Sequence, residues 1–355
     1  MPEGARSTMT LETKRVFRFD VWYHPVMEQV FAQAPGIELQ TIARNAPQEQ
    51  ILRALQASHA YQIPSARDEL PEQWRADKRL LQQLPRLLCV STNGAGYDTV
   101  DVAACTDAGV LVVNQSGANA QSVAEATIGL MIDCSRRVTE SDRRLRTARG
   151  FTREDLMGAE LYEKTLGLVG IGQVGARVAR IAQALGMRVL ACDPWLSAEE
   201  IAARGAQAVD LPSLLRASHV VSLHCPRSAQ TMNLMNTSTF RQMREGAIFI
   251  NTARGGLHDE QALYSALASG HLGGAGIDVW DQEPPPLDHP LLSLPTVVGL
   301  YHTAGVTGEA RQRMGEWAAR QIIDLFDGQE APRIVNPQVF PRFLERLQAQ
   351  DHASR

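Results

Sequence analysis

The segment KTLGLVGIGQVGARVARIAQALGMRVLACDPW, residues 164–195, constrains the fold of this chain more than any other. A short apolar run from Leu166 to Val169 leads into three glycines with the spacing Gly-x-Gly-x-x-Gly. A helical pattern follows, and a second apolar run ends at Asp193. A strand, a glycine-rich turn, a helix and a second strand in this order form a parallel βαβ unit. The segment therefore predicts a parallel sheet covered by helices.

The glycines of this turn and the acid that follows it predict a dinucleotide site. Gly170 permits the tight turn, Gly172 lets the backbone approach a pyrophosphate, and Gly175 lets the helix pack closely on the sheet. The amino end of the helix presents unpaired amides and a partial positive charge to the phosphates. Asp193 is placed to bind the ribose diol, and its charge repels a 2′-phosphate, so we expect NAD rather than NADP.

Short apolar runs alternate with helical patterns in two series, one from about Val16 to residue 92 and one from Leu166 to about Val298. A chain of 355 residues exceeds the usual size of one compact core. We therefore expect an α/β protein with two Rossmann-like or flavodoxin-like parallel-sheet domains and a cleft between them. The expected division is a substrate-binding domain of residues 1–119 and 308–337, an NAD-binding domain of residues 120–307, and a tail of residues 338–355.

Residues 120–147 give the longest helical pattern. Ser122 and Glu125 have the spacing of a capping box, which predicts a helix start near Ser122. Seven arginines lie between Arg136 and Arg153 with acidic residues among them. This mixture favours a solvated helix face, and a subunit interface is the second possibility.

The charge and the composition of the chain argue against nucleic-acid and membrane partners. The net charge of -4 provides no attraction to nucleic acid or to an anionic membrane. No apolar run reaches the length of about 18 residues that a membrane span needs. The five cysteines are scattered, form no CxxC pair and lie mostly in apolar runs, which is typical of reduced thiols. We expect a cytoplasmic protein with neither a nucleic-acid nor a membrane partner, and we identify no set of metal ligands.

Three segments that follow predicted strands each carry one ionisable side chain. They are INTARGG with Arg254, GIDVWDQEPP with Glu283 and YHTAG with His302. Each residue alone has an ordinary structural interpretation, as a surface arginine, a loop acid and a packed histidine. Together they match a reaction centre, because an arginine binds a carboxylate and a glutamate raises the pKa of a histidine that exchanges a proton.

The motifs VAEATIGLM, LGLVGIGQVG, INTARGG, GIDVWDQEPP and HTAG, in this order, resemble the D-isomer-specific 2-hydroxyacid dehydrogenase family. The resemblance extends from about Asn93 to Asn336 and includes phosphoglycerate dehydrogenase-like and hydroxypyruvate reductase-like members. It implies an NAD-dependent oxidoreductase that interconverts a D-2-hydroxy acid and a 2-oxo acid. The implied catalytic residues are Arg254, which binds the substrate, Glu283, which orients the histidine, and His302, the acid/base. It also implies a homodimer packed through residues 120–155.

The same resemblance implies further contacts with cofactor and substrate. For the cofactor these are Asp278 at the nicotinamide carboxamide, the amides of Gln173 and Val174 at the pyrophosphate, and Thr127; for the substrate they are the amides of Ala95 and Gly96 at the carboxylate.

The identity of the small acid stays open at this level. The residue before the histidine is usually proline in the family and is Tyr301 here, and Arg67 is one candidate for binding a substrate phosphate. The alternatives are 3-phosphoglycerate, hydroxypyruvate and glyoxylate. Formate dehydrogenases carry glutamine in place of Glu283, and phosphite dehydrogenases carry lysine in place of Ala95, so both are disfavoured. An alternative from another class is an NAD(H)-sensing protein-interaction module like the corepressors built on this scaffold, which a lack of turnover would favour.

Overall fold

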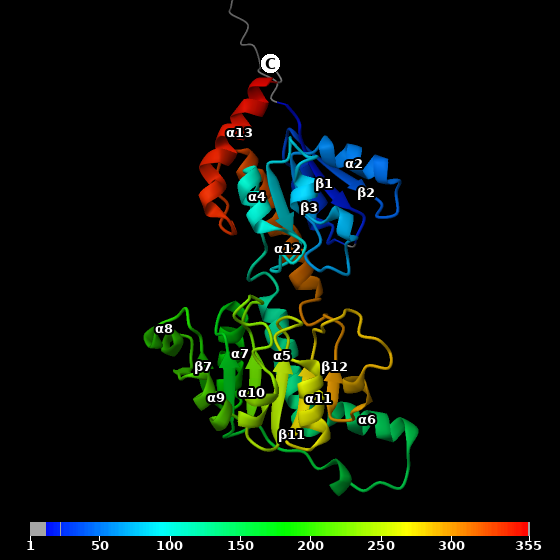
Figure 1. The fold of residues 1–355 in the computed structure, drawn as a ribbon, viewed down its shortest axis with the longest axis vertical. Helices are drawn as coiled ribbons and strands as arrows, with labels where there is room; N and C mark the ends of the chain where they lie inside the picture. The colour runs from blue at the N-terminus through cyan, green and yellow to red at the C-terminus, as the bar shows by residue number, and fades with distance from the viewer. Residues whose placement is uncertain (1–11, 22, 354–355) are drawn as a thin grey trace, which may run out of the picture. The chain divides into compact units, whose positions relative to one another are not determined.

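The computed structural model describes residues 12–21 and 23–353, which divide into two compact units (Figure 1). The chain passes from the first unit to the second between Asn119 and Ala120 and returns between Val306 and Thr307. Each unit contains one parallel sheet with helices on both of its faces. The predicted class, an α/β protein with two parallel sheets, is confirmed.

The first unit is built on a five-stranded parallel sheet with the order β2-β1-β3-β4-β5. Its strands are β1 (Lys14–Phe19), β2 (Ile37–Ile42), β3 (Ala60–Ile63), β4 (Cys89–Thr92) and β5 (Leu111–Val113). Its helices are α1 (Val26–Ala32), α2 (Gln48–Gln56), η1 (Glu72–Trp74), α3 (Lys78–Leu81), α4 (Val102–Ala108), α12 (Gly308–Phe326), η4 (Pro337–Val339) and α13 (Phe340–Ala353).

Successive residues of these strands are buried on opposite faces of the sheet. Phe17 and Tyr61 pack into one core, whereas their neighbours Val16 and Ala60 pack into the other. Helices α1, α12 and α13 contribute to this second core, so the orange and red helices of Figure 1 belong to the same unit as the blue strands. Every residue of β3, β4 and β5 is buried, as expected for strands covered on both faces, whereas the edge strand β2 alternates between partly buried and exposed residues.

The carboxyl-terminal segment differs from the tail that the sequence predicts over residues 338–355. Residues 340–353 form helix α13, with Phe343 fully buried and Leu347 nearly so. Arg346 donates hydrogen bonds to the carbonyl oxygens of Gly109 (2.7 Å) and Pro85 (2.9 Å). Apolar residues at helical spacing are few here, but they bind the helix to the sheet despite its polar composition.

The second unit is built on a seven-stranded parallel sheet with the order β12-β11-β10-β9-β6-β7-β8. Its strands are β6 (Thr165–Val169), β7 (Arg188–Cys192), β8 (Gln207–Ala208), β9 (Val220–Leu223), β10 (Ala247–Asn251), β11 (Leu272–Ile277) and β12 (Val297–Gly299). Its helices are α5 (Ala120–Arg136), α6 (Val138–Thr147), η2 (Glu154–Leu156), α7 (Gln173–Ala184), α8 (Ala198–Ala203), α9 (Leu211–Ala217), α10 (Thr237–Gln242), α11 (Glu260–Ala268) and η3 (Pro290–Ser293).

Strand β6 marks the point where the order of this sheet reverses. Its two neighbours are β7, which follows it directly, and β9, from which the later strands continue outward in sequence order. In open parallel sheets, ligands bind at the carboxyl ends of the strands on either side of such a point. The glycine-rich turn lies directly after β6, so the topology positions it at that edge.

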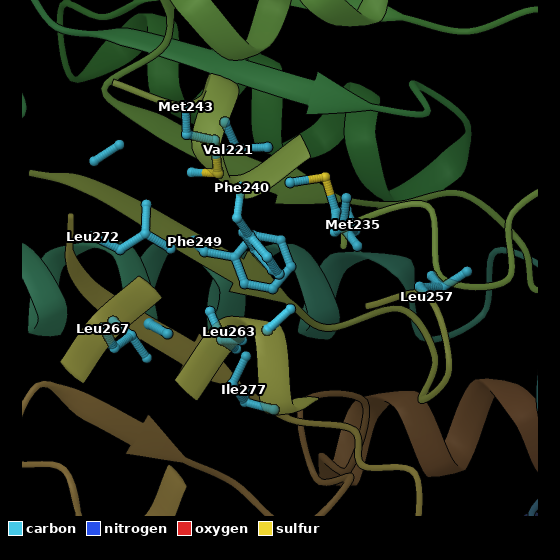
Figure 2. Close-up of a cluster of buried hydrophobic side chains, with 14 of the residues drawn as sticks. Val221, Met235, Phe240, Met243, Phe249, Leu257, Leu263, Leu267, Leu272 and Ile277 are labelled. Carbon is cyan, nitrogen blue, oxygen red and sulfur yellow. The ribbon is translucent and has the colours of Figure 1, made fainter. Parts of the chain in front are cut away.

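Two cores hold the second sheet between its helices. On one face, Phe240 of α10 and Phe249 of β10 meet edge to face with ring centroids 5.2 Å apart, and Leu263 of α11 packs beside them (Figure 2). On the other face, Met131 of α5 and Val178 of α7 pack against the sheet. The core therefore fixes both the strands and the helix that begins at the turn.

Residues 120–147 form two helices rather than one. Helix α5 begins at Ala120, so Ser122 lies inside it and is not the amino-terminal cap that the capping-box spacing predicts. The break falls at Arg137, whose φ of 54° is left-handed and whose guanidinium binds the side chain of Glu140. Asp133 accepts a hydrogen bond from the amide of Thr139 (2.8 Å) and so holds the second helix at its start. Among the described residues, no helix is both long enough and apolar enough to cross a bilayer.

Candidate active site

The glycine-rich turn has the geometry of a phosphate cradle. Gly170 has a φ of 89°, and a Cβ there would lie 2.9 Å from the backbone of His224. A Cβ on Gly175 would lie 2.5 Å from the carbonyl oxygen of Gly170, so the helix can approach the turn only with glycine there. Gly172 faces open space, because a Cβ on it would meet no described residue within 4 Å. Helix α7 begins at Gln173, and no side chain of the described residues caps its first amides. These residues fit a dinucleotide pyrophosphate.

Asp193 follows β7 and lies beside this turn. Its Oδ2 accepts a hydrogen bond from the amide of Ile171 (3.0 Å), and its Oδ1 accepts one from the amide of Trp195 (3.1 Å). Each carboxylate oxygen can accept a second hydrogen bond. The carboxylate is thus fixed against the turn while it retains capacity for the two hydroxyls of a ribose.

His302 and Glu283 form a hydrogen-bonded pair. The Nδ1 of His302 donates to the Oε2 of Glu283 at 2.8 Å, and the Oε1 of Glu283 accepts from the amide of Trp280 at 3.0 Å. The side chain of His302 is 35% exposed and that of Glu283 is 16% exposed. Glu283 is therefore held from one side and holds the imidazole on the other, which leaves Nε2 of His302 available to a ligand.

The electrostatics of the pair favour the charged form of both members. Burial lowers the pKa of His302, but the hydrogen bond and the charge of Glu283 outweigh it, so the pKa of His302 is raised above its ordinary value. Burial raises the pKa of Glu283, but the hydrogen bond and the charge of His302 outweigh it, so the pKa of Glu283 is lowered. The imidazole can therefore hold a proton at a higher pH than an isolated histidine does.

Asp278 holds the backbone around His302. The amide of His302 donates to the carbonyl oxygen of Asp278 at 2.7 Å. The backbone φ of His302 is 47°, which turns the chain at this residue. The carboxylate of Asp278 accepts hydrogen bonds from the amides of Thr303 (2.7 Å) and Ala304 (3.2 Å). Burial raises the pKa of Asp278, and these amides oppose the shift. The nicotinamide contact implied for Asp278 stays a prediction.

The loop that carries Arg254 is shaped by its neighbours. Asn251, at the end of β10, donates from its side chain to the carbonyl oxygen of Arg254 (2.9 Å) and accepts from the amide of Ala253 (3.0 Å). A Cβ on Gly255 would lie 2.0 Å from the carbonyl oxygen of Trp280, so this loop is packed directly against the segment that leads to Glu283. The structure thus brings the loops of Arg254, Glu283 and His302 together at the carboxyl ends of β10, β11 and β12.

The other residues predicted to contact the cofactor lie in helices α7 and α5. Gln173 and Val174 form the first turn of α7 beside the glycines. Thr127 is fully buried in α5, and its hydroxyl bonds the carbonyl oxygen of Val123 (2.8 Å) and the hydroxyl of Thr252 (2.8 Å). Thr127 therefore holds the segment just before Arg254, and a direct contact with the cofactor stays a prediction.

Ala95 and Gly96 lie in the first unit, in the loop that follows β4. The carbonyl oxygen of Gly94 accepts from the amide of Gln115 (2.9 Å), and that of Ala95 accepts from the side chain of Asn114 (3.0 Å). In the described part of the chain, the amides of Ala95 and Gly96 donate to no backbone carbonyl oxygen. The loop thus engages its carbonyl oxygens in internal hydrogen bonds, and the carboxylate contact implied for its amides stays a prediction.

Trp280 is a functional residue that sequence reasoning missed. Its amide binds Glu283, and its indole Nε1 donates to the carbonyl oxygen of Leu300 at 2.9 Å, two residues before His302. The side chain is 3% exposed. A buried indole N–H needs an acceptor, but the burial of Trp280 is visible only in the structure, so the sequence offered no signal for this bond. Trp280 connects the loop of the glutamate to the strand of the histidine.

Comparison with known proteins places these features in a family context. Residues 128–304 match the family model described as the NAD-binding domain of D-isomer-specific 2-hydroxyacid dehydrogenases. A glyoxylate reductase of Korarchaeum cryptofilum is 37% identical over 266 residues, which cover 74% of this chain and 80% of that protein. A D-3-phosphoglycerate dehydrogenase of Archaeoglobus fulgidus is 35% identical over 324 residues, which cover 90% of this chain but only 60% of that protein.

A solved structure of an acyclic imino acid reductase, in complex with NADPH and D-Arg, has a similar fold. Its TM-score is 0.78 at 26% sequence identity, and the match covers 90% of this chain and 99% of that one.

Proposed function

Because the chain belongs to the D-isomer-specific 2-hydroxyacid dehydrogenase family, we propose that it interconverts a small D-2-hydroxy acid and its 2-oxo acid with NAD. The observation that carries this proposal is the hydrogen-bonded pair of His302 and Glu283, which follows strands of the same sheet as the glycine-rich turn. The substrates named for its relatives support 3-phosphoglycerate, glyoxylate and hydroxypyruvate as the first candidates.

His302 acts as the acid in the direction of reduction. Its Nδ1 is engaged by Glu283, so the proton is transferred from Nε2 to the carbonyl oxygen of the oxo acid. Glu283 is a positioning residue, since it fixes the ring and stabilises its protonated form. NADH held by the glycine-rich turn and Asp193 would supply the hydride for the carbonyl carbon. In the direction of oxidation, neutral His302 takes the hydroxyl proton.

The substrate carboxylate is the group that orients the reacting carbon. We assign it to the amides of Ala95 and Gly96, which donate to no backbone carbonyl oxygen in the described part of the chain. The planar guanidinium of Arg254 binds an oxygen of the substrate through charge-assisted hydrogen bonds and stabilises the negative charge that develops on the carbonyl oxygen.

The test of this proposal is NADH oxidation by the purified full chain with a panel of oxo acids. The panel contains hydroxypyruvate, phosphohydroxypyruvate, glyoxylate, pyruvate and branched or aromatic 2-oxo acids, and absorbance of NADH is followed. We expect oxidation with at least one small acid. Tight binding of NADH without oxidation of any acid would contradict the proposal and favour an NAD(H)-sensing interaction module.

Replacement of Glu283 by glutamine is expected to move the pH profile of reduction to lower pH. Reduction needs protonated His302, so its kcat/KM falls as pH rises through the pKa of His302. Glu283 raises that pKa, and a neutral glutamine removes the charge that does so. We therefore expect the profile to shift to lower pH, with kcat/KM lost on its alkaline side and retained on its acid side.

The control for this variant is Glu260→Gln. Glu260 also pairs with a histidine, His289, at 3.0 Å in the same unit. We expect its replacement to leave the midpoint of the profile in place. An unshifted midpoint in Glu283→Gln would contradict the role given to Glu283.

A further inference from the structure

Gln321 of α12 forms buried hydrogen bonds with the segment that follows β5 in the first unit. The residue is only 2% exposed. Its Nε2 donates to the carbonyl oxygen of Asn114 at 3.1 Å and to the side-chain Oε1 of Gln115 at 2.9 Å. A buried amide with two such bonds holds its partners firmly, because breaking the bonds would leave polar groups without water or another partner. Helix α12 therefore fixes residues 114 and 115 through one side chain.

Asn114 and Gln115 in turn hold the loop that follows β4. The Nδ2 of Asn114 donates to the carbonyl oxygen of Ala95 at 3.0 Å, and the amide of Gln115 donates to that of Gly94 at 2.9 Å. Asn114 is 8% exposed and Gln115 is fully buried. A continuous series of buried hydrogen bonds thus connects Gln321 to this loop.

Two backbone carbonyl groups determine the direction of the side-chain amides. Gln115 donates from Nε2 to the carbonyl oxygen of Thr92 at 3.1 Å, so its Oε1 faces Gln321 as an acceptor. The other partner of Gln321 is the carbonyl oxygen of Asn114, which can only accept. Gln321 must therefore act as a donor in both bonds. A side chain of the same shape that lacks the N–H groups cannot form them.

We propose that Gln321 is a positioning residue for the loop of Ala95 and Gly96 and that it thereby sets the affinity of the site for the substrate carboxylate. Adjacent backbone amides bind an anion well when their direction is fixed in advance. His302 and Glu283 lie in the second unit, so the proton transfer does not depend on this loop. Loss of Gln321 should therefore raise KM and leave kcat nearly unchanged. The inference rests on the proposed function for the role of the loop.

A role of Gln321 in packing alone makes a different prediction. Methionine at this position keeps a similar length but removes the donor, and glutamate keeps the shape but presents an acceptor to two acceptors. If Gln321 only fills space, Gln321→Met and Gln321→Glu should both retain the original KM. If it positions the loop by donation, both variants should raise KM.

The first measurement is steady-state reduction of the best oxo acid of the panel by the full chain at saturating NADH. We expect KM for the acid to rise about 5- to 30-fold in Gln321→Met, the range for one or two lost hydrogen bonds. The value of kcat should stay within about 3-fold. Arg320→Met is the matched control, because Arg320 is an exposed neighbour on α12 that pairs with Glu316 of the same helix. It should change neither parameter.

The second measurement needs no turnover. The amide of Gln115 donates to the carbonyl oxygen of Gly94, so its hydrogen exchange reports how firmly the loop is held. Exchange is followed by mass spectrometry on peptides that contain residue 115. We expect about 5- to 30-fold faster exchange in Gln321→Met. Peptides from β10 in the second unit should exchange at the original rate.

Three outcomes would overturn the proposal: an unchanged KM, a loss that appears in kcat rather than in KM, and unchanged exchange at Gln115. If Gln321→Met does not fold, Gln321→Glu takes its place with the same expected direction in KM and in exchange. If the chain oxidises NADH with no acid, the proposed function fails. The exchange at Gln115 then decides the inference, since faster exchange supports the positioning of the loop by Gln321 and unchanged exchange refutes it.

Discussion

Removal of the imidazole of His302 is expected to lower kcat for oxo-acid reduction by about 10²- to 10⁴-fold, the usual contribution of a general acid. The reason is that Nε2 of His302 is the proton donor, while Nδ1 is occupied by Glu283. The binding of NADH should stay within about 3-fold of the original, because the glycine-rich turn and Asp193 are untouched. Stopped-flow or steady-state absorbance of NADH gives kcat, and calorimetry gives the Kd of NADH.

The choice of substitution matters at this position. The φ of 47° at His302 is a left-handed conformation, which alanine adopts at a cost of about 1–2 kcal/mol. Asparagine tolerates this conformation better, keeps a polar side chain and cannot transfer a proton at neutral pH. His302→Asn is thus the cleaner variant and His302→Ala its companion. Near-normal turnover by either one, with thermal unfolding unchanged, would show that another group carries the proton.

The sequence predicts those parts of the protein that depend on a motif of fixed spacing or on the order of parallel strands. The turn of Gly170, Gly172 and Gly175 was recognisable because a strand, a helix and the acid Asp193 accompany it in a fixed order. The meeting of His302 with Glu283 was predictable because both follow strands of one parallel sheet. In such a sheet the carboxyl ends of all strands share one edge.

Other features depend on contacts between distant segments. The side chain of Arg204 donates a hydrogen bond to the carbonyl oxygen of Ile171, 33 positions earlier in the sequence, and neither residue type predicts this bond. The indole of Trp280 binds Leu300 for reasons of packing that no spacing rule contains. The break at Arg137 interrupts a helical pattern that continues on both sides, and only its side-chain bonds to Glu140 reveal why it is stable. Helix propensity is a weak guide to the position of a helix end where tertiary hydrogen bonds determine that position.

Arg254 combines two roles whose loss should be large. It is expected to bind the substrate and to stabilise the charge that develops on the carbonyl oxygen, so Arg254→Ala should lower kcat/KM by about 10²- to 10³-fold. Its position depends on its loop, since Gly255 packs against Trp280 and Asn251 binds the carbonyl oxygen of Arg254. Alanine at Arg254 preserves these backbone contacts. Steady-state kinetics with the best acid of the panel provide the measurement.

Lysine and soluble guanidinium test whether the guanidinium itself is required. Arg254→Lys keeps the charge without the planar fork, so we expect a loss smaller than that of Arg254→Ala. Guanidinium added to the buffer should partly restore Arg254→Ala, and it should not restore His302→Asn. Arg241→Ala removes an exposed arginine on α10 and should leave kcat/KM unchanged. A loss in Arg254→Ala that appears only as lower thermal stability, with normal kcat/KM for the folded fraction, would contradict the assignment.

The pH profile of Arg254→Ala gives an independent check. Burial and Glu283 have the largest effects on the pKa of His302, and the charge of Arg254 lowers this pKa further. The pH profile of reduction by Arg254→Ala should therefore move to higher pH. This shift is opposite in sign to that of Glu283→Gln, because the two side chains act on the same imidazole with opposite charges.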